Sequence, residues 1–354
     1  MHSFQASDVN QALQYGLEHL LKEGQEETSR NGHVIVAPGP VCIEYVNPQQ
    51  RVLLSPTRDA NPIFHFMESL WMLAGDNDIE FPCQFNKSYA QFSDDGKTMW
   101  DAYGWRWRDF FGWDQLDAIS TELKKNPSSR RCVLGMWNAM PDCFLDEPRT
   151  PNPRGRVDDF TMAIRGGKAV PCNTHAYFAV RNGKLNLTVM NRSNDAIWGC
   201  FGANAVHFSF LLEYMAAKIG VPMGSYYQFT NNLHCYTEKF NRDKLEKVVR
   251  ECGTLAKTPD AGCLLDESFV AELPVFMKWA REALSQQDAA GINADMIVAL
   301  QSRFLWDTAV PMLLYWVYRK RKEYNTANHY LSSIKAPDWQ LACFEWAERR
   351  RVKR

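Results

Sequence analysis

The feature that most constrains the fold is the dipeptide Asn182-Gly183 together with the apolar stretches on either side of it. Both residues tolerate the positive φ angles of a type I′ turn, so the pair is a strong local signal for a two-stranded hairpin. The segment 174–180 before it is rich in aromatic and β-branched residues, and the run 185–189 after it alternates apolar and polar residues. The sequence therefore predicts a β-hairpin here.

This hairpin is flanked by residues that can carry chemistry. Pro171-Cys172 precedes it, and the polar run Asn191-Arg192-Ser193-Asn194-Asp195 ends it. A cysteine is a nucleophile only as the thiolate, which a neighbouring cation favours. A hairpin of this length can return Arg192 to the side of Cys172, where the guanidinium, Ser193 and nearby amides would form an anion site. On these residues alone, a buried structural cysteine beside a solvated loop is the alternative.

Strands and helices are mixed along the first two thirds of the chain. Helices are predicted from apolar periodicity, capping residues and proline positions, and strands from short apolar runs. The predicted helices cover 8–24, 62–75 and 114–125 and a segment beginning at Asn204, and the predicted strands cover 34–36, 41–46, 132–137 and 226–229. From residue 239 onward the pattern is charged and helical, with an apolar helix over 306–318, a break at Pro337 and a basic end that reads as a solvated tail. We expect an α/β fold with a helical C-terminal region.

Composition excludes several classes of protein. The 354 residues, 45% of them hydrophobic, are enough for one large core or two modest ones. A net charge of −1 gives no general basic field for nucleic acid. No leader is recognisable and no apolar run approaches about 18 residues, so we expect a soluble cytoplasmic protein without a membrane partner. The ten cysteines lack CxxC pairs, which favours reduced thiols over disulfides or a metal site.

The order of these motifs resembles the thymidylate synthase family and its hydroxymethylase relatives. Pro171-Cys172 is followed twenty residues later by Arg192-Ser193-x-Asp195, and then by Gly199 and Asn204 before an amphipathic helix. The resemblance runs over roughly residues 10–236. It implies a mixed β-sheet layered with helices in a catalytic domain over 1–238, with an inserted loop at about 140–167. The remaining residues, 239–354, would be a helical C-terminal extension packed on that domain.

The resemblance implies one-carbon transfer from 5,10-methylenetetrahydrofolate to C5 of a pyrimidine nucleoside monophosphate, with dUMP as the expected substrate. C5 is weakly nucleophilic until a thiolate adds at C6, and this is the role implied for Cys172. Glu68, in a Glu-x-Leu-Trp pattern, would be the acid/base group that organises water near the ring. Asn204 would meet N3-H and O4 of uracil, since an amide offers both a donor and an acceptor. Asp195 would be both a catalytic residue and one of the residues on the folate side of the site.

The resemblance also assigns the nucleotide-binding residues. The phosphate would be held by Arg30, Arg192 and Ser193, and by Arg130 and Arg131 from the partner subunit of a homodimer. On sequence alone these arginines read as ordinary surface charge. His234 and Tyr236, two apart in an extended segment and so on one face, would hold the sugar.

Several residues depart from the family pattern on the folate and water side. Tyr89 and Phe92 stand where typical members have two tryptophans against the folate, and Trp107 belongs to the same aromatic segment. Asn173 replaces the usual histidine after the catalytic cysteine. The spacing from Gly199 to Asn204 is one residue longer than usual, which puts Ala203 at the expected position if no gap is allowed. A counterpart of the family's C-terminal peptide is not recognisable.

These departures leave the product open. Hydride transfer from the folate would give a methyl group, whereas water would give a hydroxymethyl group, on dUMP or on a cytosine nucleotide. A different class of function, binding of a nucleotide or RNA without catalysis, is disfavoured because a pure binder has no use for the thiol. A cysteine hydrolase pairing Cys172 with His175 or His234 is also weak, since His175 would point to the opposite face of a strand. The residues imply no metal.

Overall fold

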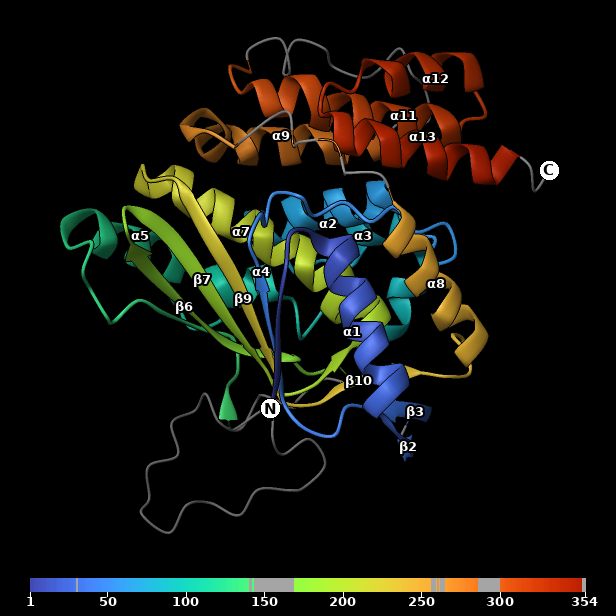
Figure 1. Ribbon diagram of the computed structural model, residues 1–354. Helices are drawn as coiled ribbons and strands as arrows, with labels where there is room; N and C mark the ends of the chain where they lie inside the picture. Colours follow the sequence, from blue (N-terminus) through green and yellow to red (C-terminus); the bar gives the residue numbers. More distant parts are fainter. Residues whose placement is uncertain are drawn as a thin grey trace.

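The computed structural model describes residues 1–29, 31–139, 142, 169–255, 259, 261, 265–285 and 300–351. A six-stranded mixed sheet runs through the molecule (Figure 1) in the order β1-β4-β9-β7-β6-β5, and a smaller sheet has the order β2-β3-β10-β8. The strands of the large sheet are β1 (His2–Ala6), β4 (Val41–Tyr45), β5 (Val133–Gly135), β6 (Asn173–Arg181), β7 (Lys184–Asn191) and β9 (Met223–Thr230). Those of the small sheet are β2 (Gln25–Ser29), β3 (Gly32–Val36), β8 (Asn194–Asp195) and β10 (Leu233–Tyr236).

The predicted hairpin is confirmed. β6 and β7 pair antiparallel, and the turn residues Asn182 and Gly183 have φ angles of 50° and 73°. Positive φ at both central residues is what a type I′ turn requires. The pairing brings Asn191 opposite Asn173, so the two ends of the hairpin meet next to Cys172.

Helices form a second layer against the sheets. The helices of this layer are α1 (Val9–Glu23), α2 (Pro62–Ala74), α3 (Glu80–Cys83), α4 (Tyr103–Arg108), α5 (Gln115–Lys125), α7 (Asn204–Ile219) and α8 (Arg242–Thr254). The central helix α7 packs on β7 and β9 and is buried along almost its whole length. Helix α8 lies along α1 (Figure 1). The predicted helices around 8–24, 62–75 and 114–125 are confirmed.

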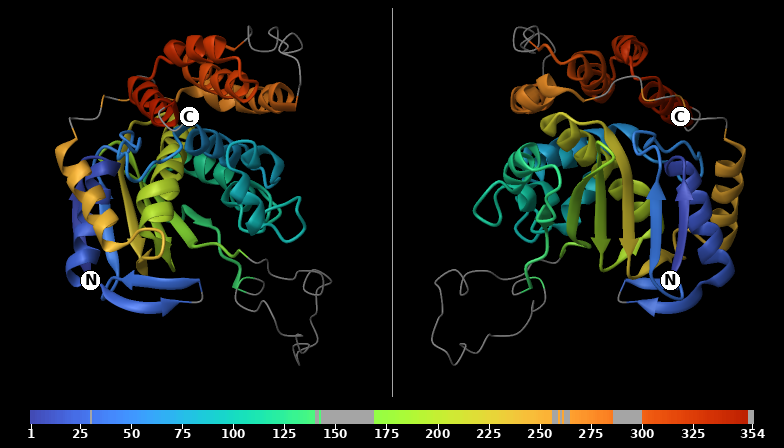
Figure 2. Two further views of the ribbon diagram at one scale, coloured as in Figure 1. Left: turned by 90° about the vertical axis from the view of Figure 1, so that its right-hand side faces the viewer. Right: turned by 60° about the vertical axis from the view of Figure 1, so that its left-hand side comes forward.

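The C-terminal helices lie as a separate layer over α2 and α7 (Figures 1 and 2). They are α9 (Glu267–Ser285), α11 (Val310–Lys320), α12 (Tyr324–Ser333) and α13 (Pro337–Arg351). A buried ion pair of Arg51 with Glu213 lies at the junction, where Glu213 also accepts the backbone N–H of Leu265. The expected solvated tail is wrong for Arg349 and Arg350, because both donate to the carboxylate of Asp59.

Three strands, β1, β2 and β8, were not expected from sequence. β1 and β2 contain mostly polar residues and have no apolar run that would predict a strand. β1 is a strand because it pairs with β4, and β2 because it pairs with the adjacent β3. β5 is shorter than the predicted 132–137. Within the described ranges, no helix combines the length and apolar content needed to cross a membrane.

Candidate active site

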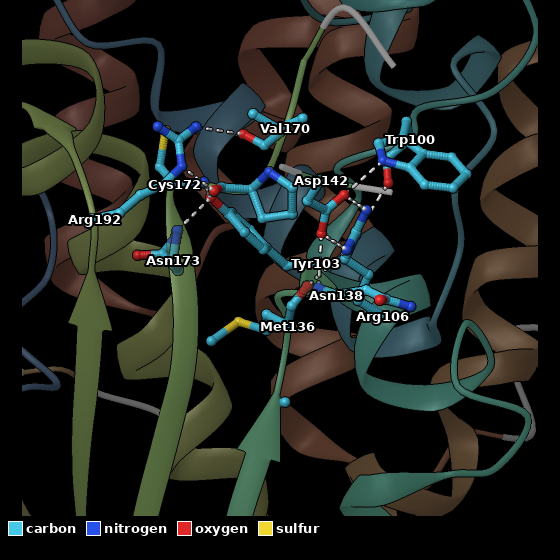
Figure 3. A network of polar contacts seen from close by, with 12 residues as sticks. Trp100, Tyr103, Arg106, Met136, Asn138, Asp142, Val170, Cys172, Asn173 and Arg192 are labelled. Carbon is cyan, nitrogen blue, oxygen red and sulfur yellow. Dashed lines mark hydrogen bonds and ion pairs between the residues drawn. The ribbon is translucent and has the colours of Figure 1, made fainter. Parts of the chain in front are cut away.

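Cys172 lies at the start of β6, where the two ends of the hairpin meet (Figure 3). The backbone N–H groups of Cys172 and Asn173 donate to the hydroxyl of Tyr103 at 3.0 and 3.2 Å. The backbone N–H of Arg192 donates to the carbonyl of Cys172 at 2.9 Å. The thiol is therefore positioned by α4 on one side and by the end of β7 on the other.

Arg192 adjoins the thiol as the hairpin argument predicts. Its Nε donates to the carbonyl of Pro171 at 2.9 Å and Nη2 to that of Val170 at 3.2 Å. The guanidinium also lies 5.4 Å from the ring centroid of Trp137. The side chain thus holds the backbone that leads into Cys172 while its charge remains next to the sulfur.

Burial raises the pKa of the Cys172 thiol, Arg192 acts in the opposite direction, and Asp101 and Asp195 add to the rise. Arg192 therefore lowers the pKa of the thiol, as expected, but burial makes the net shift upward. The free-energy cost of removing a thiolate from water is larger than the stabilisation that one neighbouring guanidinium provides. The resting thiol is protonated at neutral pH.

Three asparagines form a buried chain behind the sulfur. Nδ2 of Asn173 lies 3.4 Å from Oδ1 of Asn204, and Nδ2 of Asn204 donates to Oδ1 of Asn194 at 3.0 Å. Oδ1 of Asn173 and Nδ2 of Asn194 are buried and have no hydrogen-bond partner among the described residues. One acceptor and one donor are thus left over, which is what recognition of a ring amide requires.

The segment η3 (Ala196–Ala203) leads into α7 and is interrupted at Gly202, whose φ and ψ angles of −116° are not helical. Asn204, the first residue of α7, is the residue that contacts Asn173. Gly199 permits this arrangement, because a Cβ there would lie 2.4 Å from Oδ1 of Asn194.

Glu68 is buried on α2 and lies close to a histidine. Its Oε2 lies 3.1 Å from Nε2 of His207 on α7, and both side chains are almost wholly shielded from solvent. Burial raises the pKa of the Tyr89 hydroxyl, and the carboxylates of Glu68 and Asp101 raise it further. Glu68 therefore lies between a histidine and the aromatic segment.

Asp195 lies beside His234, its register partner in the parallel pair β8–β10. Burial raises the pKa of Asp195, while the backbone N–H of Trp198 and the charges of His234 and Arg58 oppose the rise. Oδ2 of Asp195 is buried and has no hydrogen-bond partner in the described part of the chain. Arg58 is itself buried, donates to the carbonyl of Ile197 at 2.9 Å and has its pKa lowered by burial to about 10.

The remaining expected nucleotide contacts are distributed around this centre. The rings of His234 and Tyr236 lie 5.2 Å apart on one face of β10, as expected. Ser193 follows Arg192 and is half-buried. Arg130 and Arg131 are exposed beside the edge strand β5, away from Cys172 on the same chain, and Arg131 pairs with Glu122 at 3.2 Å. Arg30 lies outside the described residues.

The expected folate side is only partly open. Tyr89 and Phe92 belong to the 3-10 helix η1 (Lys87–Phe92), and their rings lie 6.3 Å apart, with Phe92 46% exposed. The expected folate-side role of Trp107 is wrong, because its side chain is fully buried and packs against Phe208. An indole without an exposed face has a core role and cannot stack on a ligand.

Sequence reasoning missed three residues of this site. Tyr103 belongs to the same aromatic segment as Trp107 and was not singled out there. The next residue, Gly104, allows this segment to pack closely on α2, because a Cβ there would lie 2.1 Å from the carbonyl oxygen of Met72. Asp101 is a carboxylic acid in an otherwise aromatic and apolar segment, and that contrast was a usable signal. The burial of Arg58 had no sequence signal, because it depends on contacts with the distant η3.

Arg106 holds the part of the chain that precedes residues 143–168. Arg106 on α4 is fully buried and forms a bidentate ion pair with Asp142, at 2.7 and 2.9 Å (Figure 3). It also donates to the carbonyls of Trp100 and Met136. Arg106 and Arg192 thus fix the described backbone on either side of that interval. Groups of three or more potential metal ligands were not found among the described residues.

Comparison with known proteins places this geometry in context. The family model described as thymidylate synthase matches residues 12–259. A deoxyuridylate hydroxymethyltransferase of Pseudomonas phage M6 is 39% identical over 360 residues, covering 99% of this chain and 95% of the relative. A protein of the same description from Bacillus phage SP01 is 34% identical over 296 residues, covering 81% of this chain and 72% of the relative. One from Delftia phage PhiW-14 is 28% identical over 243 residues, covering 68% and 64%.

Proposed function

This chain belongs to the thymidylate synthase family and is a one-carbon transferase, and from that premise we propose that it transfers a hydroxymethyl group to C5 of deoxyuridine 5′-monophosphate. The one-carbon donor is 5,10-methylenetetrahydrofolate, which leaves as tetrahydrofolate. The observation that carries the proposal is the contact between the Cys172 loop and Arg192, with Asn173 and Asn204 directly behind the sulfur.

Cys172 acts as the nucleophile at C6. The thiolate forms with the help of Arg192, whose charge already opposes the effect of burial. Addition of sulfur to C6 makes C5 nucleophilic enough to take the methylene group. Arg192 and Ser193 also bind the phosphate, together with Arg30, and His234 with Tyr236 binds the sugar.

The amide chain recognises the base. Asn204 and Asn173 face the position of the ring with one unpaired buried acceptor and, through Asn194, one unpaired buried donor among the described residues. Such a set can meet N3-H and O4 of uracil, with the acceptor at N3-H and the donor at O4. Glu68, held by His207, takes the C5 proton through ordered water.

The folate side favours water as the final nucleophile. Tyr89 and Phe92 are smaller than the tryptophans of typical family members and leave more room beside the methylene group. Asp195, with an unpaired buried oxygen within the described chain, accepts N–H groups of the pterin. The names of the three phage relatives point to the same product.

We further propose a homodimer that forms through the large sheet. One face of this sheet is not covered by helices in the views of Figure 2. It presents half-exposed and exposed side chains, among them Val133 at 44% and Tyr177 at 42% exposure. Arg130 and Arg131 lie beside β5 at its edge, from where they can reach the partner's phosphate site.

The eight described cysteines are all free, which suits a reducing cytoplasm.

The test is incubation with 5,10-methylenetetrahydrofolate and, separately, dUMP, dCMP, UMP and CMP. We expect a hydroxymethyl group on dUMP, identified by mass, with release of tetrahydrofolate. Dihydrofolate and a methyl product would identify a thymidylate synthase instead. Turnover of dCMP alone would contradict the uracil assignment. Nucleotide binding without any turnover would favour the non-catalytic class, and Cys172→Ala is the matched control for covalent chemistry.

A further inference from the structure

One buried carboxyl group of the site has no role in the chemistry above. Asp101 precedes α4 by two residues, and its Oδ1 is shielded from solvent without a hydrogen-bond partner among the described residues. A buried carboxylate oxygen without a partner is costly. Such groups concentrate where a ligand or water completes their bonding.

The chain places Asp101 between the two sides of the site. It lies between η1, which carries Tyr89 of the folate side, and Tyr103, whose hydroxyl accepts the N–H of Cys172 on the nucleotide side. Burial is the main cause of the raised pKa values of Cys172, Tyr103 and Tyr89, and the charge of Asp101 adds to the rise in each of them.

We propose that Asp101 is the general base that takes a proton from the water molecule adding to the methylene carbon on C5. This inference rests on the proposed hydroxymethyl transfer. The water oxygen forms a bond to the methylene carbon, and its proton passes to the Asp101 carboxylate. The electron pair of the exocyclic double bond moves through the ring to O4. Its return restores C5=C6 and expels the thiolate of Cys172 from C6, and Asp101 then releases its proton to solvent.

Asp101 is better suited to this step than Glu68. Glu68 is 3.1 Å from His207 and is already assigned to the C5 proton. Arg106 is the cation that opposes the rise in the pKa of Asp101, and it pairs with Asp142 and donates to two backbone carbonyls. Asp101 therefore has a shielded Oδ1 and forms no ion pair among the described residues.

The titration of Asp101 fits a general base. Burial raises its pKa to about 6; its own backbone N–H and Arg106 oppose the rise, and Glu68 and Asp142 add to it. Tyr89, Tyr103 and Cys172 are the other titratable groups coupled to it. A base with a pKa just below the working pH is mostly ionised and still accepts a proton readily.

The test uses Asp101→Asn, which keeps the shape of the side chain and removes its basicity. In a single turnover with tritiated dUMP, we expect release of the C5 hydrogen at the wild-type rate and formation of the hydroxymethyl product slowed about 100-fold, the usual size of a general-base effect. The acid limb of the rate profile near pH 6 should disappear. Added 2-mercaptoethanol should trap the accumulated methylene group as a thioether, because a thiolate needs no base. The control is Asp109→Asn, an exposed carboxylate just after the same helix.

The failures are distinguishable. If the wild-type protein forms no hydroxymethyl product, the proposed function is wrong and this inference falls with it. If the wild-type protein forms it and Asp101→Asn does so at the same rate and with the same pH profile, only the inference is wrong. Equal slowing of hydrogen release and product formation would place Asp101 in an earlier step and also overturn it. If Asp101→Asn does not fold, Asp101→Ala with added formate replaces it, and formate should restore product formation.

Discussion

The backbone N–H of Cys172 donates to the hydroxyl of Tyr103 at 3.0 Å, so the residue that carries the thiol is held by a side chain of α4. The same hydroxyl accepts the N–H of Asn173. In Tyr103→Phe both donors lose their acceptor, which should lower the free energy of unfolding by about 1–3 kcal/mol. We expect turnover to fall as well, because the thiol loses its fixed position. Urea denaturation and steady-state kinetics measure the two effects, with Tyr318→Phe in the C-terminal helices as control.

The raised pKa of Cys172 predicts slow alkylation of the free protein at neutral pH. Below that pKa the thiolate fraction grows about tenfold for each pH unit, and the rate with iodoacetamide should follow it. Arg192→Gln removes the charge that opposes the effect of burial and should slow alkylation of Cys172 further. The modified residue is identified by mass spectrometry, and a rate that is independent of pH above 7 would contradict the assignment.

The buried pair of Arg106 and Asp142 should be sensitive to loss of one partner. Both side chains are fully shielded, so Asp142→Ala leaves an uncompensated guanidinium and should cost about 3–5 kcal/mol of stability. The double variant Arg106→Met with Asp142→Leu should recover most of that loss. Arg351→Ala, which breaks an exposed pair with Glu348, is the control and should cost at most about 1 kcal/mol.

Asp338 should make stability depend on pH. Burial raises its pKa to about 6, its backbone N–H bonds and Arg51 oppose this, and Glu213 adds to it. Because the folded state holds this proton more tightly than the unfolded state, its contribution is present below about pH 4 and is lost as the pH rises through about 6. Asp338→Asn should therefore stabilise the protein at pH 7.5 relative to pH 4.5, by at most about 3 kcal/mol. Denaturation at both pH values tests this, with the exposed Asp243→Asn as control.

Subunit mixing tests the shared arginines. Cys172→Ala and the double variant Arg130→Gln with Arg131→Gln should each be nearly inactive as homodimers. Random reassociation makes about half of the dimers mixed, each with one intact site, so about a quarter of wild-type turnover should return. If mixing restores nothing, the arginines serve their own subunit. A chain that sediments as a monomer would contradict the dimer itself.

Sequence alone was sufficient where the signal was local. The dipeptide Asn182-Gly183 predicted the turn, and the length of the hairpin was enough to bring Arg192 to Cys172. Caps and apolar periodicity likewise predicted α1, α2 and α5.

Features that depend on distant contacts could not be predicted in the same way. The polar strand β1 exists through its pairing with β4. The net shift of the Cys172 pKa depends on how deeply the thiol is buried, which no motif encodes. The contact of Asn204 with Asn173 depends on how η3 leads into α7, whereas the spacing from Gly199 left Ala203 as an alternative.

Arg106 with Asp142 and Arg192 with Val170 secure the chain independently on the two sides of residues 143–168. The first anchor ties the chain to α4, and the second ties it to the end of β7 beside the nucleophile. The entry of the chain into Cys172 is thereby clamped by the same guanidinium that opposes the effect of burial on the thiol.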